Sequence, residues 1–291
     1  MKLCNFYFSV LIVALLCVNS TCFGQILHET AIANDRSHAF FQLKGSVKSV
    51  IIETYDVDEA ETTGQSSSQV QEYKHLLGFE FNPQSVYQYH FRNDGKLIEW
   101  SFGNKDKTEP LYRIKKIYKQ VESEKFWGLI REVTEFVDSE IWERDGLLFH
   151  QTKYEYNNQK HPISSITVDS DNEVYNNGKF SYDEKDQLIK TSQSIPDKFE
   201  FSVEQFHYDD EGRICTYEWR ADAIFINLDM RVDYQYDQYN NLTRLDIIGF
   251  DDKLSLTFDN TLDHHKNWIR RTVYINDIPA YVQKKEITYY Q

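Results

Sequence analysis

Apolar and polar side chains alternate along most of this chain. Residues 231–236 read Arg-Val-Asp-Tyr-Gln-Tyr, and residues 153–156 and 179–182 follow the same period of two. Strict alternation of aromatic or β-branched residues with polar ones is typical of half-buried β-strands. Residues 123–136 have some helical character, but "LIREVTEFV" alternates equally well. The pattern therefore predicts an all-β chain without a convincing helix.

The alternating stretches recur at a fixed interval. The tyrosines that precede successive polar turns, Tyr156, Tyr182, Tyr208 and Tyr236, are 26, 26 and 28 residues apart, and a further 26 residues lead to Leu262. Weaker copies begin at Phe91 and Trp142. Internal similarity at this interval is the mark of a repeat architecture.

Each repeat has the composition of an antiparallel β-hairpin. An Asp follows the tyrosine and can accept hydrogen bonds from nearby backbone N–H groups, while Gly95, Gly146, Gly212 and Asn241 tolerate positive φ. One unit of about 26 residues then holds two strands of about ten residues and two turns. Within it, Tyr154, Phe180, Phe206 and Tyr234 share a face with the tyrosines two positions later, and we expect that face to point inward.

A meander of some 18 to 20 such strands cannot remain flat and open. Twisted sheets rarely exceed about ten strands without curling or splitting, and one apolar face must be covered. The expected fold is an antiparallel meander of hairpin repeats, curled into a barrel-like shell or folded into two layers.

The first 24 residues have the pattern of a secretory signal peptide. Lys2 precedes an apolar run at residues 6–18, and Cys22 and Gly24 are small residues before the expected cut. We expect a mature single domain at residues 25–291, exported to the periplasm, cell surface or medium, with a mobile loop at residues 60–71. After cleavage Cys215 is the remaining cysteine, and we expect it to be a buried apolar residue.

The charge balance narrows the possible partners. The chain has 32 Lys and Arg against 46 Asp and Glu, and loss of Lys2 with the signal gives 31 minus 46, or −15. Such a charge repels phosphate backbones, so no nucleic-acid partner is expected. No second apolar stretch reaches spanning length, so no membrane span is expected after signal cleavage.

The repeat phrases at residues 180–188, 206–214 and 234–242 resemble the YD repeats of RHS proteins. The ending "HHKNWIRRTVYINDIPAYVQKKEITYY" is similar to the end of small secreted bacterial proteins in that wider group, and the resemblance covers residues 43 to 291. It implies a β-shell, which in large RHS and teneurin proteins encloses cargo. This chain lacks the Asp-Pro dipeptide of the self-cleaving core of large RHS shells.

Three clusters of acidic or histidine residues are candidates for metal-binding or catalytic sites. Residues 169–173 resemble the start of a calcium loop, but Val174 and Phe180 stand where Gly and Glu are needed. Residues 263–265, Asp-His-His, offer a metal-like set, yet adjacent histidines on a strand point to opposite faces. Residues 209–211 are three consecutive acids, which cannot flank a glycoside as a catalytic pair must. All three fit solvated turns, and we expect no metal and no cofactor.

The aromatic residues are the remaining candidates for binding. Sugars stack on exposed aromatic rings, so we take the five tryptophans as the first candidate binding residues: Trp100, Trp127, Trp142, Trp219 and Trp268. The nucleophile and phosphate motifs of common enzymes do not occur, so no catalytic residue can be named. The sequence therefore favours an exported, non-catalytic binding or scaffold module for a protein or glycan. The alternatives are a glycan-active enzyme with a site between repeats, and a shortened RHS-like shell that holds a polypeptide.

Overall fold

The computed structural model describes residues 43–57, 85–125, 130–196, 200–223, 226–249 and 252–291, and these form sixteen β-strands and no helix. The strands are β1 (Val47–Asp56), β2 (Ser85–Phe91), β3 (Leu97–Asn104), β4 (Tyr112–Lys125), β5 (Ile130–Arg144), β6 (Leu147–Tyr156), β7 (Pro162–Asp169), β8 (Val174–Tyr182), β9 (Leu188–Ser194), β10 (Glu200–Tyr208), β11 (Ile214–Ala223), β12 (Ile226–Tyr236), β13 (Leu242–Gly249), β14 (Asp252–Leu262), β15 (Trp268–Ile275) and β16 (Ile278–Tyr289). The expected 18 to 20 strands exceed this number. The expected signal peptide at 1–24 and loop at 60–71 lie outside the described residues.

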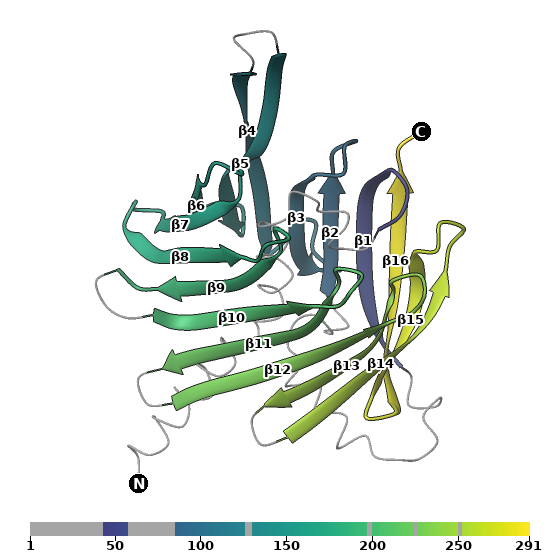
Figure 1. Cartoon of the computed structure of the whole chain (residues 1–291). Coiled ribbons are helices and arrows are strands. Elements are labelled where there is room, and N and C mark those ends of the chain that lie inside the picture. The colour runs from purple at the N-terminus through teal and green to yellow at the C-terminus, as the bar shows by residue number, and fades with distance from the viewer. Residues whose placement is uncertain (1–42, 58–84, 126–129, 197–199, 224–225, 250–251) are drawn as a thin grey trace.

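The strands form a closed barrel. Each strand pairs antiparallel with its neighbour in sequence, and β16 pairs with β1 to complete the circuit. In Figure 1, β8 to β13 run across the view, whereas β1, β2, β3 and β16 run along it, and the β4–β5 hairpin projects beyond the rest. The predicted all-β meander curled into a barrel-like shell is thereby confirmed. Closure leaves no exposed sheet edge within this circuit.

The repeat motif encodes one hairpin geometry, used six times, and the turn at residues 169–173 between β7 and β8 has the same geometry. In each hairpin the aromatic or leucine before the turn pairs with the residue six positions later, as Tyr182 does with Leu188 and Tyr208 with Ile214. We call the connecting segments the repeat turns: residues 92–96, 157–161, 183–187, 209–213, 237–241 and 263–267. Within each, the first N–H donates to the fifth carbonyl, and the fourth N–H donates to the first carbonyl. This is a type I turn followed by a bulge, which suits a short hairpin loop.

The fourth residue of every repeat turn has positive φ. Glycine meets this requirement at Gly95 and Gly212, whereas Asn240 takes φ 62° in the turn at 237–241. The sequence pattern predicts positive φ at Asn241, which is one residue after the position that has it. Asn241 is instead buried, and its Nδ2 donates to the carbonyl of Lys266 in the next repeat turn, at 3.2 Å.

The acidic residue at the start of a repeat turn acts as an internal acceptor. The Oδ1 atom of Asp183 accepts hydrogen bonds from the backbone N–H groups of Lys185 and Gln187, both at 2.8 Å. Asp237 does the same for Tyr239 and Asn241. The Asp of the motif therefore stabilises the turn that its own backbone makes.

In two repeats the tyrosine of the motif connects its hairpin to the preceding one. The Tyr208 hydroxyl donates to the carbonyl of Leu188, and the Tyr236 hydroxyl to that of Ile214, each at 2.8 Å. Both carbonyls belong to the residue that directly follows the previous repeat turn. Phenylalanine could fill the same space but could not donate, so tyrosine is required for this bond at positions 208 and 236.

The inward face of the barrel carries the core. One cluster extends over β9 to β16 and includes Leu188, Phe206 and Tyr217, with Phe180 and Tyr234 packed against it; a second lies on β1 to β3. Phe206 is 2% exposed, whereas the adjacent His207 side chain is 55% exposed. The predicted assignment of faces is confirmed at these positions. Cys215 differs from expectation, because it lies at the bulge after a repeat turn and is only half-buried.

Polar contacts close the barrel between its two ends. The backbone N–H of Lys44 donates to Asn267 Oδ1, and Asn267 Nδ2 donates back to the Lys44 carbonyl, both at 2.8 Å. The Tyr290 hydroxyl donates to the Phe91 carbonyl at 2.7 Å. These bonds repeat the tyrosine-to-carbonyl arrangement across the point where the chain's ends meet.

Candidate functional site

The structure describes four of the five candidate tryptophans, and all four lie in the barrel wall. Trp100 stacks against Tyr89 with ring centroids 6.4 Å apart, and Trp142 lies opposite Ile114 on the adjacent strand. Trp219 is buried in the core, where its Nε1 donates to Ser202 Oγ at 3.0 Å. Trp127 lies outside the described residues. Trp100 and Trp142 flank Ile114 in one row across β3, β4 and β5, whereas Trp219 lies on β11 and Trp268 on β15.

Trp268 has an unusual environment for a core tryptophan. The Lys285 Nζ lies 3.9 Å from its ring centroid, and the Arg271 guanidinium lies 4.3 Å from it. Such contacts are cation–π interactions. The Trp268 ring therefore contacts two basic side chains of the same protein.

The acidic clusters form turns, as their composition predicted. Asp169 Oδ1 accepts from the N–H groups of Asp171 and Glu173 at 2.9 and 3.0 Å, in the turn between β7 and β8. Asp209 forms an ion pair with Arg213 at 2.7 Å within its repeat turn. These carboxylates are engaged by their own turns.

His264 and His265 lie on the last repeat turn, beside the closure of the barrel. Their rings are 3.9 Å apart, so they do not point to opposite faces as two strand neighbours would. His265 also contacts the Tyr289 ring, at 4.4 Å, and the Tyr289 hydroxyl donates to Asp263 Oδ2 at 2.5 Å. Burial and this hydrogen bond raise the pKa of Tyr289 to about 12. Within the described parts of the chain, no group of three His, Cys, Asp or Glu side chains is placed to hold a metal ion.

Charged side chains also face the barrel interior. Lys116 on β4 and Glu140 on β5 lie directly opposite each other, with Nζ 3.6 Å from Oε1 and side chains 1% and 0% exposed. On β10, Glu204 accepts hydrogen bonds from the Thr191 hydroxyl at 2.7 Å and the Tyr217 hydroxyl at 3.1 Å. Buried ionic groups of this kind cost desolvation energy and require such partners.

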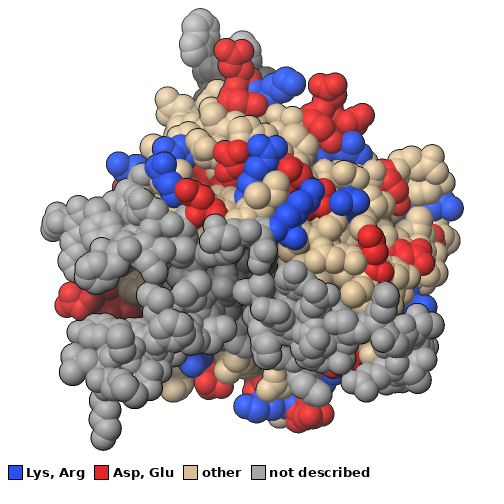
Figure 2. All heavy atoms as spheres, turned by 90° about the horizontal axis from the view of Figure 1, so that it is seen from below, with Lys and Arg blue, Asp and Glu red and all other residues tan. Residues whose placement is uncertain are grey.

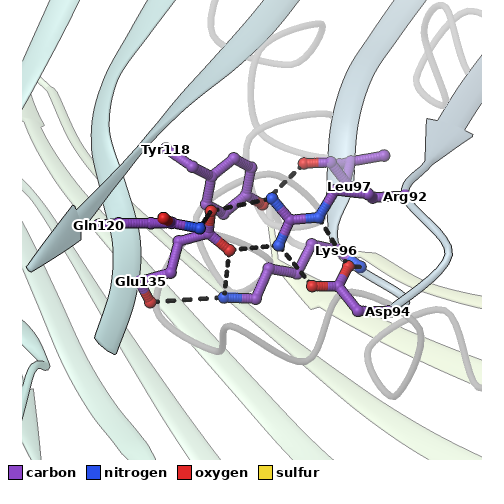
Figure 3. A network of polar contacts seen from close by, with 7 residues as sticks. All are labelled: Arg92, Asp94, Lys96, Leu97, Tyr118, Gln120 and Glu135. Carbon is purple, nitrogen blue, oxygen red and sulfur yellow. Dashed lines mark hydrogen bonds and ion pairs between the residues drawn. The ribbon is translucent and has the colours of Figure 1, made fainter. Parts of the chain in front are cut away.

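A polar network fixes the projecting β4–β5 hairpin at its base (Figure 3). Arg92, which replaces the usual Asp of the repeat turn, donates its Nη1 to Glu135 Oε1 at 2.9 Å and its Nε to Asp94 Oδ1 at 2.9 Å. Lys96 lies 3.4 Å from the Glu135 carboxylate, and Arg92 and Lys96 both lie over the Tyr118 ring. Hydrogen bonds from Arg92 lower the pKa of both Glu135 and Asp94.

We expect Glu135→Gln to destabilise the protein by about 1 kcal/mol at pH 7. Because the folded-state pKa of Glu135 is depressed, its contribution is fully present above the unfolded value of about 4.3 and disappears as the pH falls through the folded value. Urea unfolding at pH 7 and pH 3 measures this difference. Glu184→Gln, in an exposed repeat turn, is the matched control. A difference from wild type that is the same at both pH values would contradict the assignment.

The strongest candidate for a binding surface is an apolar patch at the ends of β6 and β8. We call it the rim patch and define it by Leu147, Leu148, Phe149, Val174 and Tyr175, whose exposed fractions range from 39% to 73%. His150 joins its two halves, with its ring 4.0 Å from Phe149 and 4.6 Å from Tyr175. Exposed apolar groups gathered in this way mark interaction sites more often than single exposed residues do.

The rim patch is bordered by three acidic residues and by Arg144, which lies 4.0 Å from Asp145. Burial lowers the pKa of His150 at its centre, which favours the neutral ring. Asp145, Asp171 and Glu173 are exposed in the two adjoining turns. Elsewhere, on the face seen in Figure 2, basic and acidic side chains are interspersed, so that face shows no large single-sign patch.

The sequence carried signals for these features that the alternation analysis missed. "LLF" at residues 147–149 is three consecutive apolar residues after an Asp-Gly turn, where alternation calls for a polar one. Glu204 lies two positions before the inward Phe206, so the period of two already placed a carboxylate inside the barrel.

Comparisons with known proteins give remote structural likenesses. No family model and no curated protein matches this sequence. A porin-like protein from Bacteroides uniformis is 9% identical, with a TM-score of 0.47 over 84% of this chain and 98% of that one. A porin-like protein from Bacteroides vulgatus is 13% identical, with a TM-score of 0.30 over 84% of this chain and 98% of that one. The Tc holotoxin pore of Photorhabdus luminescens is 11% identical, with a TM-score of 0.29 over 77% of this chain and 13% of that one. Among the described residues, no helix is long and apolar enough to cross a membrane.

Proposed function

We propose that this protein is an exported, non-catalytic binding module that holds a polypeptide partner on its rim patch. Export is supported by the signal-peptide pattern of residues 1–24. The observation that carries the binding role is the exposure of five apolar side chains at two adjoining hairpin ends. A hairpin turn does not require such residues, because polar turn residues serve equally well there.

The composition of the rim patch fits a protein partner better than a sugar. Tyr175 and Phe149 provide rigid aromatic area, and the Arg144 guanidinium lies 5.9 Å from the Phe149 ring. Aromatic residues and arginine are enriched at the energetic centres of protein interfaces. The rings of Phe149 and Tyr175 are also joined through His150, so three rings adjoin at the patch.

The border of the rim patch defines the chemistry of the partner. Asp145, Asp171 and Glu173 place three negative charges at this border, where Arg144 adds one positive charge. Complementary charge favours encounter and orientation. The partner we propose is a polypeptide with an apolar segment flanked by Lys or Arg.

Site-specific photo-crosslinking in the native host tests this function. A benzophenone amino acid at position 175 should give an adduct with a polypeptide that mass spectrometry identifies and that has a basic-flanked apolar segment. The same probe at position 239, an exposed tyrosine on a repeat turn, is the control and should not give that adduct. With the purified partner peptide, Tyr175→Ala should weaken binding at least about tenfold, the loss typical of an aromatic interface anchor.

Two results would overturn the proposed function. One is an equal yield of the same adduct from positions 175 and 239. The other is binding of a glycan, in an array of purified oligosaccharides, that Tyr175→Ala abolishes while leaving the peptide affinity unchanged. The latter would favour a sugar ligand over a polypeptide.

A further inference from the structure

Lys285 is a basic residue placed on the inner face of the barrel. It lies on β16 opposite Ile52 of β1, next to the closure of the barrel, and is 7% exposed. Its neighbours in sequence, Lys284 and Glu286, are exposed, as strand alternation requires. The Lys285 side chain therefore points inward while those of Lys284 and Glu286 point out.

The surroundings of Lys285 are apolar or positively charged. Its Nζ contacts the Trp268 ring, and no described residue forms a hydrogen bond or contact ion pair with it. Arg271 contacts the same ring, with its Nε bound to Gln283 Oε1 at 2.6 Å, and Gln283 Nε2 donates to Thr54 Oγ1 at 3.1 Å. These contacts hold a second cation close to Lys285.

The nearest negative charge acts on Lys285 only from a distance. The Asp263 carboxylate accepts hydrogen bonds from the Tyr289 hydroxyl and the Asn267 N–H, so it is already engaged. Burial, Arg271 and Lys44 lower the pKa of Lys285 well below its usual value, against the opposing effect of Asp263. A buried amine that lacks a contacting anion is costly to keep charged.

We propose that Lys285, with Arg271 beside it, forms an oxyanion-binding site inside the barrel, for the carboxylate or phosphate group of a small ligand. A bound oxyanion supplies the contact charge that Lys285 lacks. Burial and the nearby Arg271 make the charge on Lys285 costly without an anion, so a bound oxyanion would stabilise it. This site lies on β15 and β16, and it does not depend on the rim patch or on its partner.

The test uses inorganic phosphate and sodium acetate as separate probes of the mature protein at pH 7, with sodium chloride holding the ionic strength constant. At least one of them should raise the melting temperature of the wild type and of Lys284→Met, the exposed neighbour. The affinity of Lys285→Met for that anion should fall at least about tenfold, the loss expected for one charge-assisted hydrogen bond. Because Met keeps the apolar stem without a buried charge, Lys285→Met should fold.

A second readout reports on the amine itself. In protein labelled with carbon-13 at lysine Cε, the signal missing from Lys285→Met identifies Lys285, and the bound anion should shift that signal. Methionine replacement that leaves the anion's effect intact would overturn the site, as would a Lys285 signal that does not respond to either anion. Stabilisation by phosphate alone would indicate a phosphate ligand, and stabilisation by acetate alone would indicate a carboxylate.

Discussion

Phe206→Ala is expected to lower the free energy of unfolding by about 3–5 kcal/mol, the usual cost of truncating a buried Phe. Phe206 is one of the largest fully inward side chains of the barrel, and its ring lies 5.5 Å from that of Tyr217. Truncation leaves a void between β10 and β11 that the paired backbones cannot close. Denaturant unfolding followed by tryptophan fluorescence measures the loss.

The adjacent residue is the control for Phe206. His207 points outward, and its Nε2 lies 3.8 Å from Glu218 on the barrel surface. Exposed pairs of this kind contribute at most about 1 kcal/mol, so His207→Ala should change stability little. If His207→Ala were the more damaging change, the assignment of the inner and outer faces would be wrong.

Lys116→Met is expected to destabilise the barrel by about 3–5 kcal/mol, because it removes the cation opposite a buried carboxylate. Lys116 and Glu140 are almost fully buried, so water cannot replace the lost charge at Glu140. Lys115→Met removes the outward neighbour, which pairs with Glu143 at the surface, and should cost at most about 1 kcal/mol. Thermal and urea unfolding of both variants gives the comparison.

The double replacement Lys116→Met with Glu140→Leu separates charge from packing. Apolar groups of similar volume in place of a buried ion pair are often neutral or stabilising, so most of the lost stability should return. A double variant that is less stable than Lys116→Met alone would show that Glu140 stabilises the barrel independently of Lys116.

Local patterns explain why the fold could be predicted. The hairpin that joins Tyr182 to Leu188 depends on residues 182–188 alone, and the same short phrase recurs along the chain. Alternation then places Phe180 and Phe206 inside. Curling followed from the number of strands, because a long twisted meander cannot stay flat, but a curled shell and two packed layers both remained possible.

Contacts between distant residues explain what could not be predicted. Arg92 breaks the motif of its repeat turn, and its partner Glu135 comes from a hairpin 43 residues away. Lys116 meets Glu140 only because of the register of β4 against β5. Trp268 was a reasonable candidate for a sugar-binding ring, but its cationic neighbour Lys285 comes from the next strand. The rim patch could not be predicted for a different reason: it lies at strand ends, where apolar and polar residues do not alternate.

The tyrosine bonds between hairpins also bear on how such a chain can change length. Tyr208 and Tyr236 each donate a hydrogen bond to the hairpin before them, and Asp183 and Asp237 accept hydrogen bonds within their own turns. Duplication or loss of one 26-residue unit in the middle of the gene would therefore preserve hydrogen bonds of these two kinds. It would change the circumference of the barrel by two strands. The ends are constrained differently, since Lys44 must meet Asn267 and Tyr290 must meet Phe91. The number of repeats inside the barrel can thus change during evolution, whereas the residues that join its first and last strands must stay complementary.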